Sequence, residues 1–118
     1  MNIEKIEKQS LFIHYCKENY YKGIFPGNTK QRNCFEYERL IQIIKVYIEN
    51  NLVERFSEYL CEGEYLIQLW AAHLILEYFK PDESLKLKCI AQIVKYSENA
   101  LEEEVALQEK AWLLNYYK

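Results

Sequence analysis

Glycine and proline are scarce in this chain, which has 3 glycines and 2 prolines among its 118 residues. A β-rich fold of this size needs many turn residues, so their scarcity favours helices. No hydrophobic run reaches the roughly 18 residues that a helix needs to cross a bilayer. The first ten residues, MNIEKIEKQS, lack the apolar stretch of a secretion signal. We therefore expect a helical protein of the cytoplasm that makes no membrane contact.

Residue patterns that bind metals and cofactors are also missing. The chain has two histidines, His14 and His73, and its four cysteines are widely separated without a C-x-x-C pair. A structural zinc site needs such ligands at close spacing. The sequence also contains no Gly-rich phosphate loop and no G-x-S-x-G motif. We therefore expect no metal, no cofactor and no catalytic residues, and interpret the thiols as small buried hydrophobic groups.

The composition is that of a folded chain. Hydrophobic residues make up 50% and charged residues 28% of the sequence, which distinguishes it from a disordered segment. Its length predicts a single domain, residues 1–118. The formal net charge of −3 argues against nucleic acid as a partner, because phosphate binding needs a basic face. Ordinary solubility also explains a charge of this size.

Apolar residues recur at helical spacing and predict about six helices. Asn28 or Thr29 is the expected N-cap of the second helix, and Gly63 the left-handed residue that ends the third. Asp82 is expected to cap the fifth helix. The expected ranges are about 2–22, 28–49, 52–60, 64–79, 82–98 and 99–116.

Several faces can be assigned from the same spacing. Asn33 falls on the apolar side of the second helix, where its amide would tie the preceding loop to the helix. Asn99 and Glu102 resemble a capping box for the last helix. The buried stripe of that helix would run from Leu101 through Val105 and Trp112 to Tyr116. The fifth helix is expected to turn four residues inward, namely Leu87, Ile90, Ala91 and Val94.

The segment 64–79 is apolar on nearly every side, with Ala71 and Ala72 at its centre. A surface helix shows one apolar stripe, so this helix should be enclosed by its neighbours. Short connections make successive helices antiparallel neighbours. Pairing the third helix with the fourth and the fifth with the sixth gives two units of roughly 30 to 40 residues. With the first two helices as a third pair, the chain would form a short HEAT-like α-solenoid, with an ordinary compact bundle as the alternative.

From about Asn33 to the C-terminus, the chain resembles a bacterial HEAT-like family of unknown function. The residues that carry the resemblance are Asn33, the stretch LVERFSEYLCEGEY, IQLWAA at 67–72, and Trp112. The IQLWAA stretch is similar to a V-R-x-x-A-A helix motif, with Gln68 in place of the arginine. The resemblance implies a HEAT-like fold. By analogy with small helical proteins encoded beside secreted toxins, it suggests an immunity protein.

Three residues on the apolar fourth helix form a candidate site. Trp70, His73 and Glu77 project to one side at i, i+3 and i+7. They could form a polar-aromatic recognition patch, or a base oriented by a carboxylate. The alternative, which we favour, is a solvated His73–Glu77 pair beside a core tryptophan.

Acidic and tyrosine residues supply the other candidates. Glu98 and Glu102, Glu103 and Glu104 cluster near the start of the last helix, where the helix dipole favours negative charge. The cluster is either a solvated helix start or an anionic patch for a basic partner. The 11 tyrosines include two adjacent pairs, 20–21 and 116–117, so one ring of each pair should point outward. Tyr117 is one such candidate for contact with a partner.

Two functions follow from these observations. The first is a protein-binding module, in its most concrete form a cytoplasmic immunity protein that neutralises a bacterial toxin with a basic domain. The second is an enzyme on a HEAT-like scaffold that acts on nucleic acid, such as a base-excising glycosylase. That enzyme needs a basic concave surface and a carboxylate in an aromatic pocket. The acidic net charge disfavours it.

Overall fold

The structure is a computed structural model that describes residues 11–118, and no strand occurs among them. Short 3₁₀ helices span Thr29–Gln31, Glu58–Cys61 and Glu64–Leu66. The prediction of an all-α chain is confirmed over these residues. The α-helices are α2 (Phe12–Lys22), α3 (Phe35–Glu49), α4 (Val53–Ser57), α5 (Ile67–Tyr78), α6 (Glu83–Asn99) and α7 (Glu103–Tyr116).

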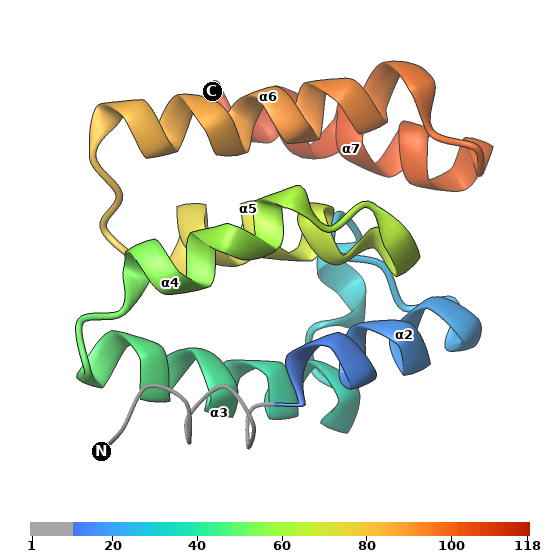
Figure 1. The fold of residues 1–118 in the computed structure, drawn as a ribbon. Helices are drawn as coiled ribbons and strands as arrows, with labels where there is room; N and C mark the ends of the chain where they lie inside the picture. Colours follow the sequence, from blue (N-terminus) through green and yellow to red (C-terminus); the bar gives the residue numbers. More distant parts are fainter. Residues whose placement is uncertain (1–10) are drawn as a thin grey trace.

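The helices lie in three layers, with α6 and α7 on one side, α4 and α5 in the middle, and α2 and α3 on the other side (Figure 1). Helix α5 packs against α6 and also contacts α2 and α4, while α6 packs against α7. No helix within residues 11–118 is both long and apolar enough to span a bilayer.

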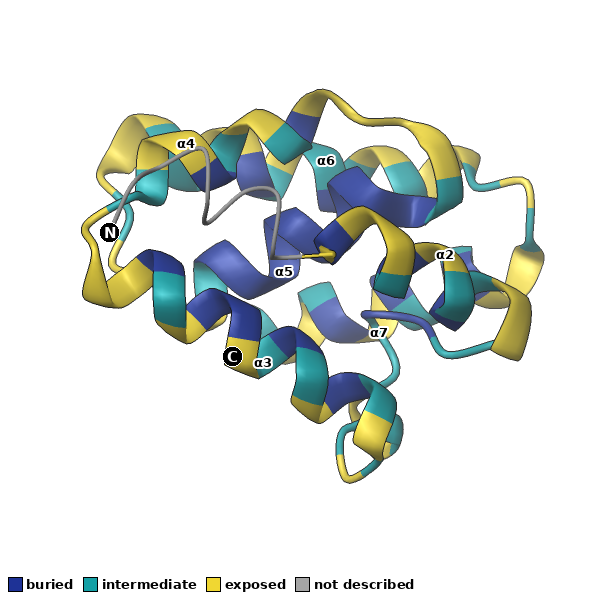
Figure 2. Cartoon of the chain, turned by 60° about the horizontal axis from the view of Figure 1, so that its bottom comes forward, coloured by how far each residue is buried: buried dark blue, intermediate teal, exposed yellow. Residues whose placement is uncertain are grey.

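Helix α5 forms the centre of the core, as its all-round apolar pattern predicts. Every residue from 67 to 75 is buried, and Figure 2 shows the helix in the buried colour along most of its length. Ala71 and Ala72 have no exposed surface, so neighbouring elements contact this helix closely at its midpoint.

The N-terminal helices begin differently from the prediction. Helix α2 ends at Lys22 with Gly23 as a left-handed C-cap, and the expected residues 2–10 of this helix lie outside the described part. Asn28 caps only a 3₁₀ turn, and α3 begins at Phe35. The side chain of Gln31 explains the delay, because it accepts from the Phe25 N–H and donates to the Gly23 carbonyl, which fixes the loop.

Two further expectations in the first half are wrong. Asn33 precedes α3 and is exposed, so it does not lie on the apolar face. Gly63 has φ −79°, an ordinary right-handed value, and the left-handed residues are Tyr65 and Leu66 at φ 51° and 59°. The chain reverses two residues later than expected because Glu62 is extended, and its carbonyl accepts from the Gln68 N–H.

Helix α6 starts as predicted, since the Asp82 carboxylate accepts from the Leu85 N–H. Its inward face is different: Leu87 is 56% exposed and Ala91 is exposed as well. Apolar residues lie on several sides of this helix, so more than one stripe fits the sequence. The stripe that packs inward consists of Cys89, Ile93 and Ser97.

The connection from α6 to α7 contradicts the predicted capping box. Asn99 is the last residue of α6, and Glu102 is the N-cap of α7 without a side-chain cap bond. Leu101 is fully exposed rather than part of a buried stripe. The Glu102 carboxylate is directed instead to the hydroxyl of Tyr20 on α2.

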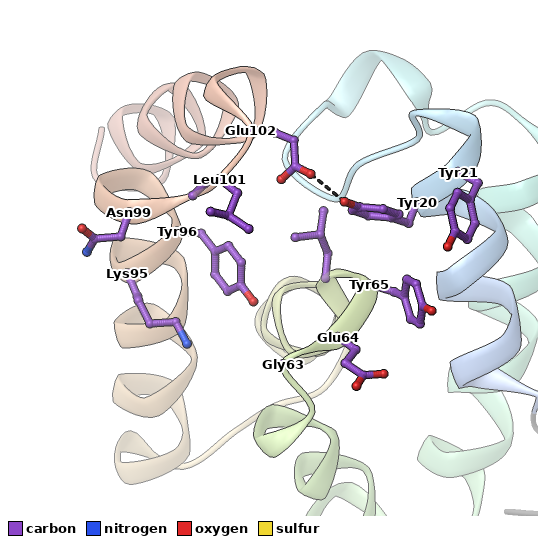
Figure 3. A pocket seen from close by; sticks show the side chains of 12 residues that line it. Tyr20, Tyr21, Gly63, Glu64, Tyr65, Lys95, Tyr96, Asn99, Leu101 and Glu102 are labelled. Atoms are coloured by element: carbon purple, nitrogen blue, oxygen red, sulfur yellow. Dashed lines mark hydrogen bonds between the residues drawn. The ribbon is translucent and has the colours of Figure 1, made fainter.

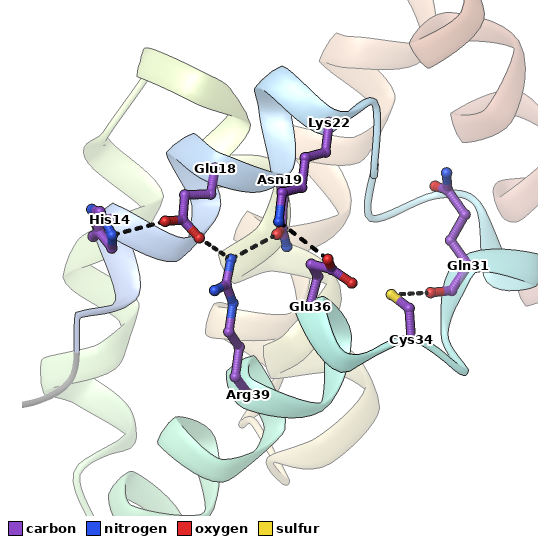
Figure 4. A network of polar contacts seen from close by, with 8 residues as sticks. All are labelled: His14, Glu18, Asn19, Lys22, Gln31, Cys34, Glu36 and Arg39. Atoms are coloured by element: carbon purple, nitrogen blue, oxygen red, sulfur yellow. Dashed lines mark hydrogen bonds and ion pairs between the residues drawn. The ribbon is translucent and has the colours of Figure 1, made fainter.

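A charged network joins α2 to α3 (Figure 4). Arg39 on α3 pairs with Glu18 on α2 at 2.5 Å and donates to Asn19 at 3.4 Å. Lys22 and Glu36 form a second ion pair at 3.2 Å. Hydrogen bonding to Arg39 holds the pKa of Glu18 below its usual value. These contacts set the position of α2, which forms one wall of the pocket described next.

Candidate partner-binding site

The predicted patch of Trp70, His73 and Glu77 is not an accessible surface. Trp70 is 2% and His73 1% exposed, so a partner cannot contact either side chain. The predicted solvated His73–Glu77 pair is also wrong, since Glu77 pairs with Arg32 at 2.5 Å. Both errors have one cause: α5 is covered on the side that carries His73 by α7 and by the loop around Gly27.

His73 forms a buried pair with Glu109 of α7. The distance from Nε2 to Oε1 is 2.5 Å, and neither side chain has more than 1% of its surface exposed. The rings of His73 and Trp112 form a T-shaped contact, with centroids 4.6 Å apart. This arrangement joins α5 to α7 in the core. Sequence spacing already placed Val105 and Trp112 inward, and Glu109, at i+4 from Val105, falls on the same stripe.

Gly27 closes the buried pair from outside. A Cβ atom at this position would lie 2.0 Å from Glu109 Oε2, so only glycine fits without movement. Arg32 holds the same loop by donating to the Pro26 carbonyl. The His73–Glu109 pair is therefore closed off from solvent, so it stabilises the fold and is not accessible to a substrate.

An accessible pocket lies where the turn between α6 and α7 meets α2 and the segment before α5 (Figure 3). Its volume is about 640 Å³. Tyr20 and Tyr21 of α2 form one wall with Tyr65, and Tyr96 of α6 lies opposite, as Figure 3 shows. The remaining lining comes from the turn before α7, the end of α6 and the segment before α5: Gly63, Glu64, Leu66, Lys95, Asn99, Ala100, Leu101 and Glu102.

Three of the tyrosines form a packed cluster. The ring centroids of Tyr20, Tyr21 and Tyr65 are 5.5 to 5.9 Å apart. The Tyr20 hydroxyl donates to Glu102 Oε1 at 2.6 Å. This bond to a carboxylate raises the pKa of Tyr20, and hydrogen bonding with Tyr65 raises the pKa of Tyr21. Both hydroxyls therefore remain protonated donors near neutral pH.

The backbone beneath this cluster is strained. Tyr65 and Leu66 are consecutive non-glycine residues with left-handed φ values of 51° and 59°. Such residues cost about 1–2 kcal/mol each and concentrate at binding sites. Leu66 is buried and Tyr65 packs on Tyr20 and Tyr21, which offsets this cost. Both strained residues line the pocket, and we call their backbone the pocket floor.

Gln68 organises the opposite wall. With its amide oriented to satisfy its neighbours, its oxygen accepts from the Tyr96 hydroxyl at 2.7 Å and from Lys95 Nζ at 2.8 Å. Burial raises the pKa of Tyr96. An arginine at position 68, as in the motif that the sequence resembles, would bring a second positive charge against Lys95. The glutamine thus accepts hydrogen bonds where an arginine could only donate.

The four acidic candidates have two kinds of position in the structure. Glu102 lines the pocket, and Glu98, Glu103 and Glu104 are exposed on the adjoining chain. Tyr117 is 66% exposed, as expected. It follows the opposite end of α7, about 20 Å along the helix axis from Glu103 at 1.5 Å per residue, so it does not share a site with the acidic cluster.

Sequence reasoning missed most of this pocket. One ring of the pair 20–21 was expected to point outward, and that ring is Tyr21, which is 69% exposed. Its neighbours Tyr65, Tyr96 and Leu101 were not recognised. They belong to three segments that no local pattern connects. The high tyrosine content was the one sequence signal for such a surface.

The described cysteines and acidic residues form no chemical centre. Within residues 11–118, no group of three or more His, Cys, Asp or Glu side chains is placed to hold a metal ion. Cys16 and Cys89 are buried, and burial raises both thiol pKa values, that of Cys89 to about 12. These two thiols are therefore protonated and poor nucleophiles at neutral pH.

Comparison of the chain with protein-family models, with curated proteins and with solved structures found no match.

Proposed function

We propose that this chain is a protein-binding module whose tyrosine pocket receives a basic segment of its partner. One observation carries the proposal: four tyrosines from three segments surround a hollow whose rim carries Glu102 and the fully exposed Leu101. Tyrosine gives broad, rigid contact area. Neighbouring carboxylates steer a partner of opposite charge.

The more specific form of the proposal combines the pocket with the family resemblance. The scaffold is then a short HEAT-like solenoid of antiparallel helix pairs in the cytoplasm, and the chain an immunity protein that neutralises a bacterial toxin. The partner would be a basic toxin domain. Support for the basic partner comes from the acidic rim at Glu98 and Glu102–Glu104, whereas the toxin itself follows only from the resemblance.

A matched pair of leucine variants tests the proposal. The chain is co-expressed with a toxin-like protein encoded beside it, and growth and complex formation on size exclusion are measured. Leu101 at the pocket and Leu114 near the far end of α7 are 100% and 74% exposed, so Lys at either position should leave the fold intact. Leu101→Lys places a positive charge against the basic segment and should abolish the complex and growth rescue, while Leu114→Lys should retain both.

Two results would overturn the proposal. If neither the original chain nor the Leu114→Lys variant forms a complex or rescues growth, the immunity function fails. If Leu114→Lys alone abolishes the complex, the partner binds the opposite end of α7, near Tyr117, and the pocket is not the binding site. Circular dichroism melting of each variant confirms that the fold is retained.

A further inference from the structure

The protein contains two internal examples of how it binds a guanidinium group. Arg39 lies over the ring of Tyr15, 4.1 Å from its centroid, and pairs with Glu18 at 2.5 Å. Arg32 lies over the ring of Tyr37 at 5.4 Å and pairs with Glu77 at 2.5 Å. In both cases a tyrosine face and a glutamate carboxylate act on one planar cation, which gains from stacking and from charge-assisted hydrogen bonds.

The tyrosine pocket presents the same two groups without an arginine. Tyr20 and Glu102 are in direct contact, with the hydroxyl bound to Oε1, and a carboxylate can accept further hydrogen bonds through its second oxygen. Arg32, Arg39 and Arg55 are the arginines of this sequence, and none lines the pocket within the described residues. The pocket therefore supplies the tyrosine ring and the carboxylate of this kind of contact, but not the arginine that binds to them elsewhere in the molecule.

Lysine 95 does not complete it. Its ammonium group is held at Gln68 Oε1 and over the Tyr96 ring, 5.1 Å from the centroid. Figure 3 shows Lys95 on the Tyr96 side of the pocket, away from Glu102. The lining also includes a second carboxylate, Glu64. Two carboxylates and one engaged ammonium leave the pocket with a net negative charge.

We infer that the pocket binds an arginine side chain of the protein partner, with its guanidinium group against the Tyr20 ring and paired to Glu102. This inference rests on the proposed function, because it names the chemistry of the segment that enters the same pocket. Arginine fits better than lysine, since a planar guanidinium stacks on a ring and reaches a carboxylate at its edge, whereas an ammonium is a compact and strongly hydrated point charge.

Short peptides test the inference without a protein partner. The probes are acetyl-Gly-Gly-Xaa-Gly-Gly-amide, with arginine, lysine or citrulline at Xaa, titrated into the isotope-labelled protein. Citrulline has nearly the shape of arginine but no charge. The arginine peptide should bind saturably at millimolar concentration and shift the NMR signals of Tyr20 and Leu101. The lysine peptide should bind more weakly, and the citrulline peptide at least about tenfold more weakly.

Neighbouring glutamates supply the matched variants. Glu102→Gln should weaken the arginine peptide about tenfold. Glu103→Gln removes an exposed charge of the rim that does not line the pocket, so it should weaken the arginine peptide far less than Glu102→Gln does. Equal loss in both variants would show general charge attraction instead of a site at Glu102 and would overturn the inference.

The remaining outcomes separate the inference from the proposed function. No saturable shift with the arginine peptide, equal binding of the lysine peptide, or equal binding of the citrulline peptide each overturns the arginine pocket. The proposed function is judged independently by the Leu101→Lys and Leu114→Lys variants. A partner complex that depends on Leu101 but not on Glu102 would keep the binding module and discard the arginine.

Discussion

Two glutamates at the C-terminal helix, Glu102 and Glu109, are seven residues apart and have opposite surroundings. Glu109 has no exposed surface and pairs with His73 of the core helix α5. Glu102 is half-buried at the pocket rim and accepts from the hydroxyl of Tyr20. Both join α7 or its N-cap to a segment distant in sequence. They differ in whether a carboxylate oxygen remains accessible to another molecule.

This difference separates a structural pair from a binding group. A buried polar group that loses its partner has neither water nor a hydrogen bond to replace it, so removing one member of a buried pair costs far more than removing one at the surface. An exposed contact contributes little to folding, but its charge remains available for association. Of the two, Glu109 should therefore matter for the fold, and Glu102 for recognition.

The largest expected effect comes from breaking the buried pair. Glu109→Ala removes the hydrogen-bond partner of His73 and leaves a cavity beside Trp112, so the free energy of unfolding should fall by about 3–5 kcal/mol. Chemical denaturation measures this change. Glu102→Ala, the matched variant at the rim, should cost no more than about 1 kcal/mol. Similar losses in the two variants would contradict the division of roles.

Glycine substitutions should give the next largest effect. Gly27→Ala brings a Cβ to 2.0 Å from Oε2 of Glu109, a carboxylate whose other oxygen, Oε1, is bound to His73. The change should cost about 1–3 kcal/mol. Gly63→Ala is the control. Its nearest neighbour would be 3.9 Å away and its φ is −79°, so stability should stay the same or rise by up to about 1 kcal/mol. Thermal melting distinguishes them, and a stable Gly27→Ala variant would show that Glu109 is free to move.

The acidic rim should affect rates more than stability. Replacing Glu102, Glu103 and Glu104 together with Gln should slow association with a basic partner about tenfold at low salt. The difference should shrink as ionic strength rises, because salt screens exposed charges. Surface plasmon resonance over a salt series measures this trend. An unchanged association rate at low salt would remove steering from the proposal.

The smallest effect concerns the titration of Tyr20. Its bond to Glu102 raises the pKa of the hydroxyl in the folded state above the unfolded value of about 10. The stabilisation from this contact is therefore complete below about pH 10 and is lost as pH rises through the folded pKa. Tyrosine ¹³Cζ NMR should show the Tyr20 pKa falling in Glu102→Gln and unchanged in Glu103→Gln. Identical titrations in both variants would refute the contact.

Local patterns predicted the features that depend on neighbouring residues in sequence. The burial of α5, the Asp82 cap and the exposed ring of Tyr117 all follow from helical spacing and propensity. These features need no knowledge of how the helices pack. The all-α class could be predicted for the same reason.

Features that depend on packing between distant segments could not be predicted. His73 was assigned to Glu77, four residues away, but its partner is Glu109, 36 residues away. Leu87 was placed inward, although α6 has several apolar stripes and a different one faces α5 and α7. A single sequence indicates which residues share a helix face, but it does not show how each helix is rotated against its neighbours. Both the buried His73–Glu109 pair and the pocket depend on that rotation.

The left-handed pair Tyr65–Leu66 has a consequence for the thermodynamics of binding. Two adjacent residues in this region, fixed by a buried leucine and two tyrosine contacts, leave the pocket floor few alternative conformations. A partner then loses little affinity to ordering the receptor. We expect the backbone around residues 63–66 to be nearly unchanged between the free and bound protein, as in rigid docking, with most of the conformational entropy lost by the incoming side chain.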